Sequence, residues 1–147
     1  MSDWKSDLAN FFSEKEEKNE LNEEKLKDTE AEVAKFYSKV VIPAFQELKV
    51  ELEKYYREVR ISSGLTSASI IVIYKGQKEI DYSIKVRIYP YNAFPYPHTR
   101  FRDESGKIYI TEGFLRSGSQ AYNISQIKKN EIIQHFLVDY KRSMRRS

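Results

Sequence analysis

Apolar residues recur at helical spacing from about residue 30 to residue 60. Their mean step is about 3.7 residues, close to the period of a straight α-helix, along the positions Val33, Tyr37, Val40, Ala44, Leu48, Leu52, Tyr55 and Val59. Thr29 precedes Glu32 by three residues, the spacing of a capping box, so the helix is expected to begin there. The stripe is too broad for a coiled-coil seam and predicts a helix that lies across a sheet. Pro43 lacks an amide hydrogen, which predicts a kink near Lys39 or Val40.

The first 28 residues have little to bury. Four large apolar residues fall on one helical face near the N-terminus: Trp4, Leu8, Phe11 and Phe12. The Glu- and Lys-rich stretch that follows has only Leu21 and Leu26 as large apolar residues. Residues 1–28 are therefore predicted to form an amphipathic arm and a charged helical linker, ahead of a single α+β domain at residues 29–147. The arm either projects from this domain or folds back on it as a short first helix, and the sequence leaves both arrangements open.

The middle of the chain alternates between apolar and polar residues, as β-strands do. A β-branched run at 68–74 and an alternating run at 79–89 predict a hairpin closed by Gly76 and Gln77. On the second strand the side chains of one face are apolar: Ile80, Tyr82, Ile84, Val86 and Ile88. The opposite face is mostly polar: Asp81, Ser83, Lys85, Arg87 and Tyr89. One face of this sheet is expected to pack and the other to meet water.

Prolines interrupt the strand pattern next. Pro90, Pro95 and Pro97 predict an irregular, aromatic-rich connection. Two short strands are expected after it, at 99–103 and 107–111. Their predicted inward residues are Phe101, Ile108 and Ile110, and their predicted outward residues are Arg100, Arg102, Lys107 and Tyr109. Residues 120–124 are a candidate for a fifth strand.

The last periodic segment predicts a helix at about 127–144. Its apolar stripe consists of Ile132, Ile133, Phe136, Leu137, Tyr140 and Met144. The predicted fold is therefore α+β: a long N-terminal helix (about 30–60) and a C-terminal helix (about 127–144) packed on one face of a four- or five-stranded antiparallel sheet.

Composition excludes several classes of protein. The chain has 147 residues, which fits one domain and not two full ones. It has no cysteine, which excludes a disulfide framework, a thiolate zinc site and a cysteine nucleophile. It shows neither a secretory leader nor an apolar run of about 18 residues. We therefore expect a cytoplasmic protein that has no membrane partner.

Catalytic chemistry finds little support in the sequence. The two histidines, His98 and His135, lie 37 positions apart in different predicted elements, which is no metal-ligand spacing. Acidic residues gather with a lysine in two places, around Asp81 and around Asp103, and such groups can hold a divalent ion for hydrolysis. Strand faces and tight turns use the same residues for solubility and turn formation. A metal-dependent hydrolase is thus the least favoured hypothesis, and no cofactor is expected.

Charge is distributed unevenly. Residues 1–60 carry 11 Lys and Arg against 15 Asp and Glu, a net charge of −4, and residues 61–147 carry 14 against 7, a net charge of +7. Cations and aromatic rings together are what a single-stranded nucleic acid requires. The candidate residues for such binding are Lys85, Arg87, Tyr89, Arg100, Arg102, Tyr109, Lys128 and Lys129. The alternative is an ordinary solvated strand face.

The favoured hypothesis is a non-enzymatic binding or adaptor protein that is oligomeric through its N-terminal helical arm. Its partner is then another protein or a second copy of the chain, with nucleic acid as the alternative. The candidate contact residues lie in the arm and in the aromatic loop: Trp4, Leu8, Phe11, Phe12, Tyr91, Phe94 and Tyr96. An amphipathic helix is a common ligand of protein grooves, and prolines fix the rings of the loop in place.

Overall fold

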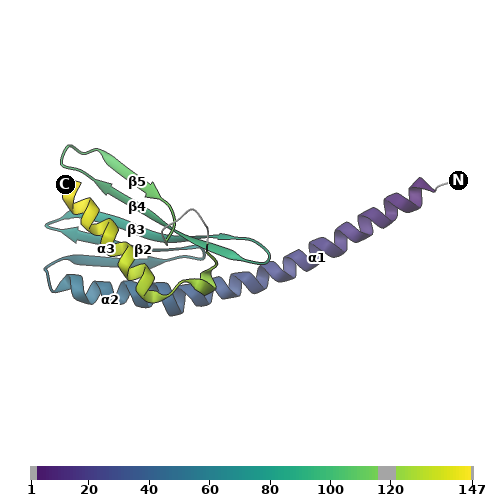
Figure 1. Cartoon of the computed structure of the whole chain (residues 1–147), viewed down its shortest axis with the longest axis horizontal. Coiled ribbons are helices and arrows are strands. Elements are labelled where there is room, and N and C mark those ends of the chain that lie inside the picture. Colours follow the sequence, from purple (N-terminus) through teal and green to yellow (C-terminus); the bar gives the residue numbers. More distant parts are fainter. Residues whose placement is uncertain (1–2, 116–121, 147) are drawn as a thin grey trace.

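The computed structural model of the chain describes residues 3–115 and 122–146 (Figure 1). The helices are α1 (Trp4–Phe36), which continues through a π-helical turn (Tyr37–Val41) into α2 (Ile42–Glu53), a short 3-10 turn (Ile124–Gln126) and α3 (Lys129–Arg146). The strands are β1 (Glu58–Ser63), β2 (Ser67–Tyr74), β3 (Gln77–Ile88), β4 (Ala93–Arg102) and β5 (Ile108–Glu112). They form one antiparallel sheet in the order β1-β2-β3-β4-β5. The predicted α+β fold is confirmed.

The N-terminal helix begins far earlier than residue 30. Asp3 caps it, because its carboxylate accepts hydrogen bonds from the amides of Lys5 and Ser6 at 3.2 and 3.4 Å. The chain stays helical past Pro43, which lies in the first turn of α2. The π-helical turn, at Tyr37–Val41, lies where a kink was expected. Pro43 cannot donate the usual helical hydrogen bond to the residue four positions earlier, and a π-helical turn changes the hydrogen-bond pattern just before it.

The predicted end of this helix at residue 60 is wrong. The helix ends at Glu53, and Tyr56 adopts a φ of 68° with 89% of its surface exposed. Val59 is buried as predicted, but on strand β1, where it pairs with Val72. Alternation along a strand places Val59 toward the core just as helical spacing would have done, so the apolar pattern did not reveal the change of structure.

The β2–β3 hairpin lies where the sequence predicts it, with its turn one residue earlier. Tyr74 pairs with Gln77, so the two turn residues are Lys75 and Gly76. Their φ values of 51° and 79° are both positive, as a type I′ turn requires. The apolar face of β3 packs inward as predicted, with Ile80, Tyr82 and Ile84 fully buried.

The predicted irregular connection is right for Pro90, which lies between β3 and β4, and wrong for the other two prolines. Pro95 and Pro97 belong to β4 and pair with Val86 and Ile84 of β3. Strand β5 pairs with residues 98–102 of β4, so among the strands of the described residues the first half of β4 is an edge of the sheet. An edge tolerates proline because the missing amide hydrogen has no neighbouring strand to bond.

Strand β5 shows the opposite face to the one predicted. Tyr109 pairs with Phe101 on the inner face and stacks on it at 5.2 Å, whereas Ile108 and Ile110 lie outward beside Arg102 and Arg100. A turn closed by the Asp103 carboxylate fixes this register, and one residue of slip exchanges the two faces.

The candidate fifth strand at 120–124 is also wrong in its described part. Gln120 and Ala121 lie outside the described residues. Tyr122 is not in a strand, and Asn123 caps the 3-10 turn.

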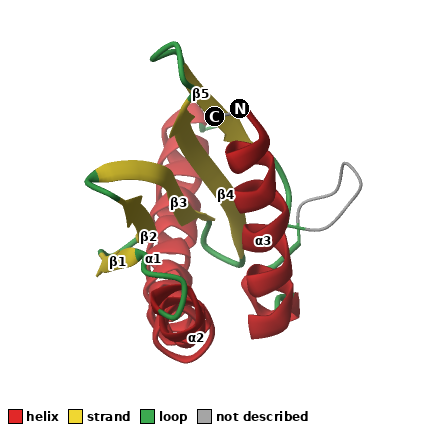
Figure 2. Ribbon diagram, turned by 90° about the vertical axis from the view of Figure 1, so that its left-hand side faces the viewer, coloured by secondary structure: helices red, strands yellow, loops and turns green. Residues whose placement is uncertain are grey.

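The core lies between the sheet and its two helical neighbours, α2 and α3, which pack side by side (Figure 2). Tyr82 of β3 is its centre. Its ring contacts Phe45 of α2 at 6.2 Å and Phe136 of α3 at 5.3 Å, both edge to face. The predicted C-terminal helix is confirmed with bounds within two residues.

Phe45→Ala is expected to lower the free energy of unfolding by about 3–5 kcal/mol, because it removes a ring with no exposed surface from the centre of the core. Val50→Ala on the same helix is the control, and we expect a change within about 0.5 kcal/mol because Val50 is exposed. Urea denaturation measures both. Equal losses would contradict this description of the core.

Candidate functional site

The arm of the protein is the part of α1 that precedes Thr29. The Thr29 hydroxyl donates to the Pro90 carbonyl at 2.9 Å, which ties the helix to the end of the β3–β4 hairpin. Residues 3–28 are exposed apart from Asn22 and Leu26, which are half-buried. The arm projects from the domain, as Figure 1 shows, and does not fold back on it. From Trp4 to Thr29 an α-helix rises about 37 Å.

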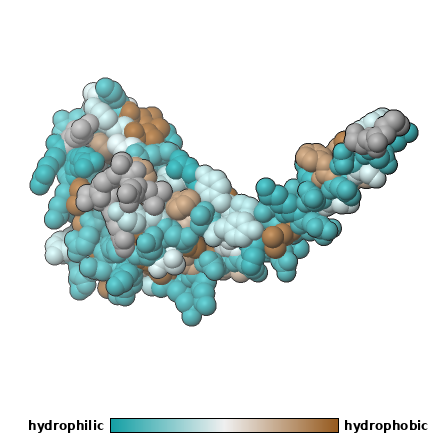
Figure 3. All heavy atoms as spheres, turned by 45° about the vertical axis from the view of Figure 1, so that its right-hand side comes forward, coloured by the Kyte–Doolittle hydropathy of each residue, from teal (hydrophilic) through white to brown (hydrophobic). Residues whose placement is uncertain are grey.

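Four large apolar side chains gather near the free end of this arm. We call Trp4, Leu8, Phe11 and Phe12 the arm tip, and their exposed fractions are 66, 48, 58 and 52%. Phe11 and Phe12 contact each other edge to face at 5.4 Å, and Lys5 lies over the Trp4 ring. Figure 3 shows hydrophobic atoms near the end of a mostly hydrophilic arm. The predicted tip residues thus form one surface.

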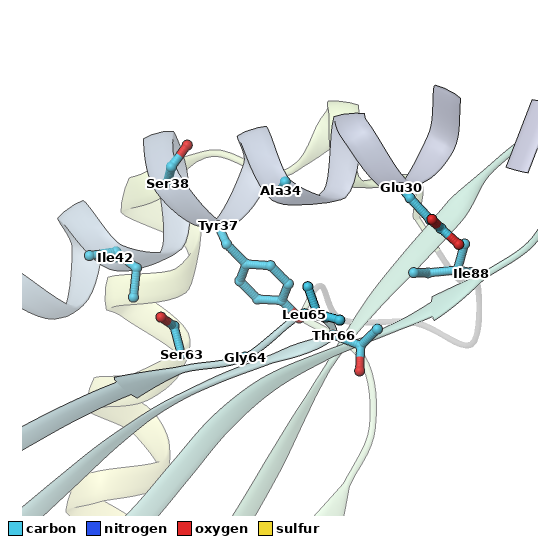
Figure 4. Close-up of a pocket in the computed structure, with 10 residues that line it drawn as sticks. All are labelled: Glu30, Ala34, Tyr37, Ser38, Ile42, Ser63, Gly64, Leu65, Thr66 and Ile88. Carbon is cyan, nitrogen blue, oxygen red and sulfur yellow. The ribbon is translucent and has the colours of Figure 1, made fainter. Parts of the chain in front are cut away.

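A groove of about 520 Å³ lies at the base of the arm. One wall is the helix, the other is the β1–β2 turn, and Ile42 and Ile88 lie at its ends (Figure 4). We call it the root groove. Its helical wall consists of Glu30, Ala34, Tyr37 and Ser38, and its opposite wall of Ser63, Gly64, Leu65 and Thr66. Leu65 is 92% exposed at the lip. Sequence reasoning missed this groove, because its walls are 25 or more positions apart in the chain.

Part of the predicted cationic and aromatic set does come together on the outer sheet face. Lys85 pairs with Tyr96 and Arg87 with Phe94 across β3 and β4. The Arg87 guanidinium lies 4.0 Å from the centre of the Tyr96 ring, and Tyr89 contacts Phe94 at 5.8 Å. These five residues form the basic aromatic patch.

The other predicted nucleic-acid residues lie elsewhere. Arg100 pairs across the strands with Asp81, which partly offsets its charge. Arg102 lies two residues further along β4, opposite Ile108. Tyr109 is on the inner face. The Lys129 ammonium binds Glu47 of α2 at 2.9 Å, in the helical layer behind the sheet.

Two more predicted residues stay outside the patch. Lys128 is exposed just before α3 and belongs to that helical layer. Tyr91 is exposed in the β3–β4 connection, close to the patch but without a contact to its rings among the described interactions. Only part of the predicted surface is therefore continuous.

The acidic groups considered for metal binding are separated. Glu79 has no partner in the strand register, since Val72 pairs with Ile80 and Ile73 with Lys78. This bulge directs its carboxylate away from Asp81 and toward Arg57, at 3.0 Å, and the Tyr140 hydroxyl, at 2.7 Å.

Burial and the bond to Glu79 raise the pKa of Tyr140 to about 12. In the described part of the chain no three His, Asp or Glu side chains lie close enough together to hold a metal ion.

A polar network crosses the core between α3 and the sheet. His135 Nδ1 and the Tyr82 hydroxyl lie 2.8 Å apart, and the Thr99 hydroxyl donates to Asp139 at 2.6 Å. Burial raises the pKa of Tyr82, and burial also lowers the pKa of His135 against the attraction of Asp139. The Tyr82 hydroxyl is out of reach of a substrate, because the residue has no exposed surface. These bonds fix how α3 sits on the sheet, a role that spacing in the sequence did not reveal for His135.

A scan against models of known protein families finds no match for this chain, and a search of curated proteins finds no significantly similar sequence. Among the described helices, none combines the length and the apolar character that crossing a bilayer requires.

Stability is expected to fall as the pH drops through about 6.5, the pKa of an unfolded histidine. The folded state depresses the pKa of His135, so the unfolded state binds more protons in the window below 6.5, and protonation favours unfolding there. Above about pH 6.5 His135 is neutral in both states, and its contribution to the free energy of unfolding is fully present. Urea denaturation between about pH 5 and about pH 8 measures it.

His135→Gln should flatten this pH dependence, and Val138→Ala, at an exposed position of the same helix, should preserve it. The same slope in His135→Gln as in the natural chain would contradict the assignment to His135.

Proposed function

We propose that this protein is a non-enzymatic binding or adaptor protein that captures a protein partner with its arm tip. The observation that carries the proposal is the exposure of four large apolar side chains at the end of a helix that its own domain does not cover. Full burial of one such side chain is worth about 1.5–3 kcal/mol, so a partner that covers the tip gains several contacts of this size.

The arm is suited to this role because it is helical before it binds. Asp3 caps the tip, and the charged stretch contains Glu–Lys pairs at a spacing of four residues, at Glu14 with Lys18 and Glu23 with Lys27. A ligand already in its bound conformation loses less conformational entropy on association. An amphipathic helix that lies in an apolar groove is a recurrent mode of protein recognition.

Photo-crosslinking in living cells tests this proposal. A photoreactive phenylalanine analogue at Phe11 should yield covalent adducts of defined mass with a protein partner. The same analogue at Glu17, which is exposed on the polar side of the arm, is the matched control. Adduct formation at Phe11 no stronger than at Glu17 would contradict the proposal.

A second candidate function is the binding of single-stranded nucleic acid by the basic aromatic patch. The observation that favours it is the Arg87 guanidinium on the Tyr96 ring, beside Lys85 and Phe94. The cationic side chains would bind phosphates, and bases would stack on the exposed aromatic rings. Each base stacked on an aromatic side chain contributes about 1–3 kcal/mol to binding.

Fluorescence anisotropy with a labelled single-stranded RNA tests the second candidate. Arg87→Ala should weaken binding and make the salt dependence shallower by about one unit of slope. Arg60→Ala is the control, because Arg60 lies on the distant strand β1 and pairs with Glu58 at 3.1 Å. An equal effect of the two substitutions would contradict specific binding by the patch.

A further inference from the structure

Within residues 3–115 and 122–146, no segment of the same chain fills the root groove. The apolar segment nearest in character is the arm tip, but Leu8 and Ala34 of the groove wall are 26 residues apart on the same unbroken helix. At the rise of an α-helix this is about 39 Å. The tip of a chain therefore cannot reach that chain's own groove while α1 stays helical.

The tip and the helical wall of the groove have the same spacing. Tip residues lie at positions 4, 8, 11 and 12, and wall residues at 30, 34, 37 and 38, so both sets follow the pattern i, i+4, i+7 and i+8. Each set covers two turns of one helical face. An incoming tip laid antiparallel to α1, between the helix and Leu65, thus presents an apolar ridge as long as the wall that receives it.

Charge favours the approach of one copy's arm to another copy's domain. Residues 1–28 carry 5 Lys and Arg against 9 Asp and Glu, a net charge of −4. The whole chain has a net charge of +3, so residues 29–147 carry a net charge of +7. Opposite net charges accelerate encounter and select orientations in which the arm meets the domain.

We propose that the occupant of the root groove is the arm tip of a second copy of this chain, and that two copies exchange tips in a two-fold dimer. The inference rests on the proposed function and names the partner of the arm tip. The same two copies exchange tips about a two-fold axis, so both contacts are satisfied within one pair and the assembly closes as a dimer and not as a filament. It also accounts for Leu65, whose side chain is almost fully exposed at the lip of an apolar groove.

Sedimentation equilibrium of the full chain gives the first test. The molar mass should be that of a dimer, and the double substitution Leu8→Glu and Phe12→Glu should weaken association more than about tenfold, since it places carboxylates in the groove. Glu17→Lys on the polar side of the arm is the control and should preserve the dimer. Circular dichroism verifies that each variant folds. A monomeric natural chain, or a dimer that persists in the double variant, overturns the inference.

Disulfide trapping identifies which surfaces meet, and the chain has no cysteine of its own to confuse the result. Mild oxidation of a mixture of Trp4→Cys and Leu65→Cys chains should give a linked heterodimer, since disulfides require Cα atoms about 4.4–6.8 Å apart. Glu17→Cys replaces Trp4→Cys in the control. Linkage of Trp4→Cys chains only to each other indicates tip-to-tip contact and overturns the inference.

The exchange of tips and the capture of a protein partner by the arm tip can be distinguished by experiment. If the chain is monomeric but Phe11 crosslinks to a different protein, the exchange of tips is wrong and the proposed function stands. If Phe11 yields no adduct above the Glu17 control, neither with another protein nor with a second copy, both are wrong.

Discussion

The burial of one end of α1 beneath the sheet is the constraint on which the rest of the structure depends. Val33 and Phe36 are buried there, next to Tyr37 of the π-helical turn, whose hydroxyl donates to the Ile84 carbonyl at 3.0 Å. Since the helix is continuous, these contacts also fix the direction of its other end. The π-helical turn before Pro43 preserves this continuity into α2. Thus core packing holds the arm tip in solvent, and the root groove forms where the helix crosses the edge of the domain.

Local patterns predicted those elements that local sequence determines. The β2–β3 hairpin and α3 follow from alternation, turn residues and helical spacing, and all appear in the structure. The errors occur where two structures share one pattern. Val59 satisfies both a helix and β1, and Pro95 and Pro97 are compatible with a strand only because β5 leaves that part of β4 at an edge. Such information depends on strand neighbours, which a single segment does not contain.

The candidate surfaces were predictable to different degrees. The arm tip lies within one helical segment, so spacing alone places its four residues together. The nucleic-acid set spans several elements, and sequence reasoning assigned Tyr109 to the wrong face because the register of β5 depends on the turn at Asp103. The root groove combines residues from the N-terminal helix and the β1–β2 turn, and the first half of β1 was itself predicted as helix. A pocket built across a misassigned element has no signal in the linear pattern.

The central claim is that α1 is one rigid helix that holds the arm tip away from its own domain. The most direct test is a spin-label distance between Phe12 and Leu65, measured on doubly labelled chains diluted in unlabelled protein so that each assembly contains one labelled copy. The 22 residues from Phe12 to Ala34, beside Leu65 in the groove, correspond to about 33 Å of helix. The account predicts a narrow distribution near that distance. A main population below about 20 Å would show that the arm folds back, and it would contradict the account.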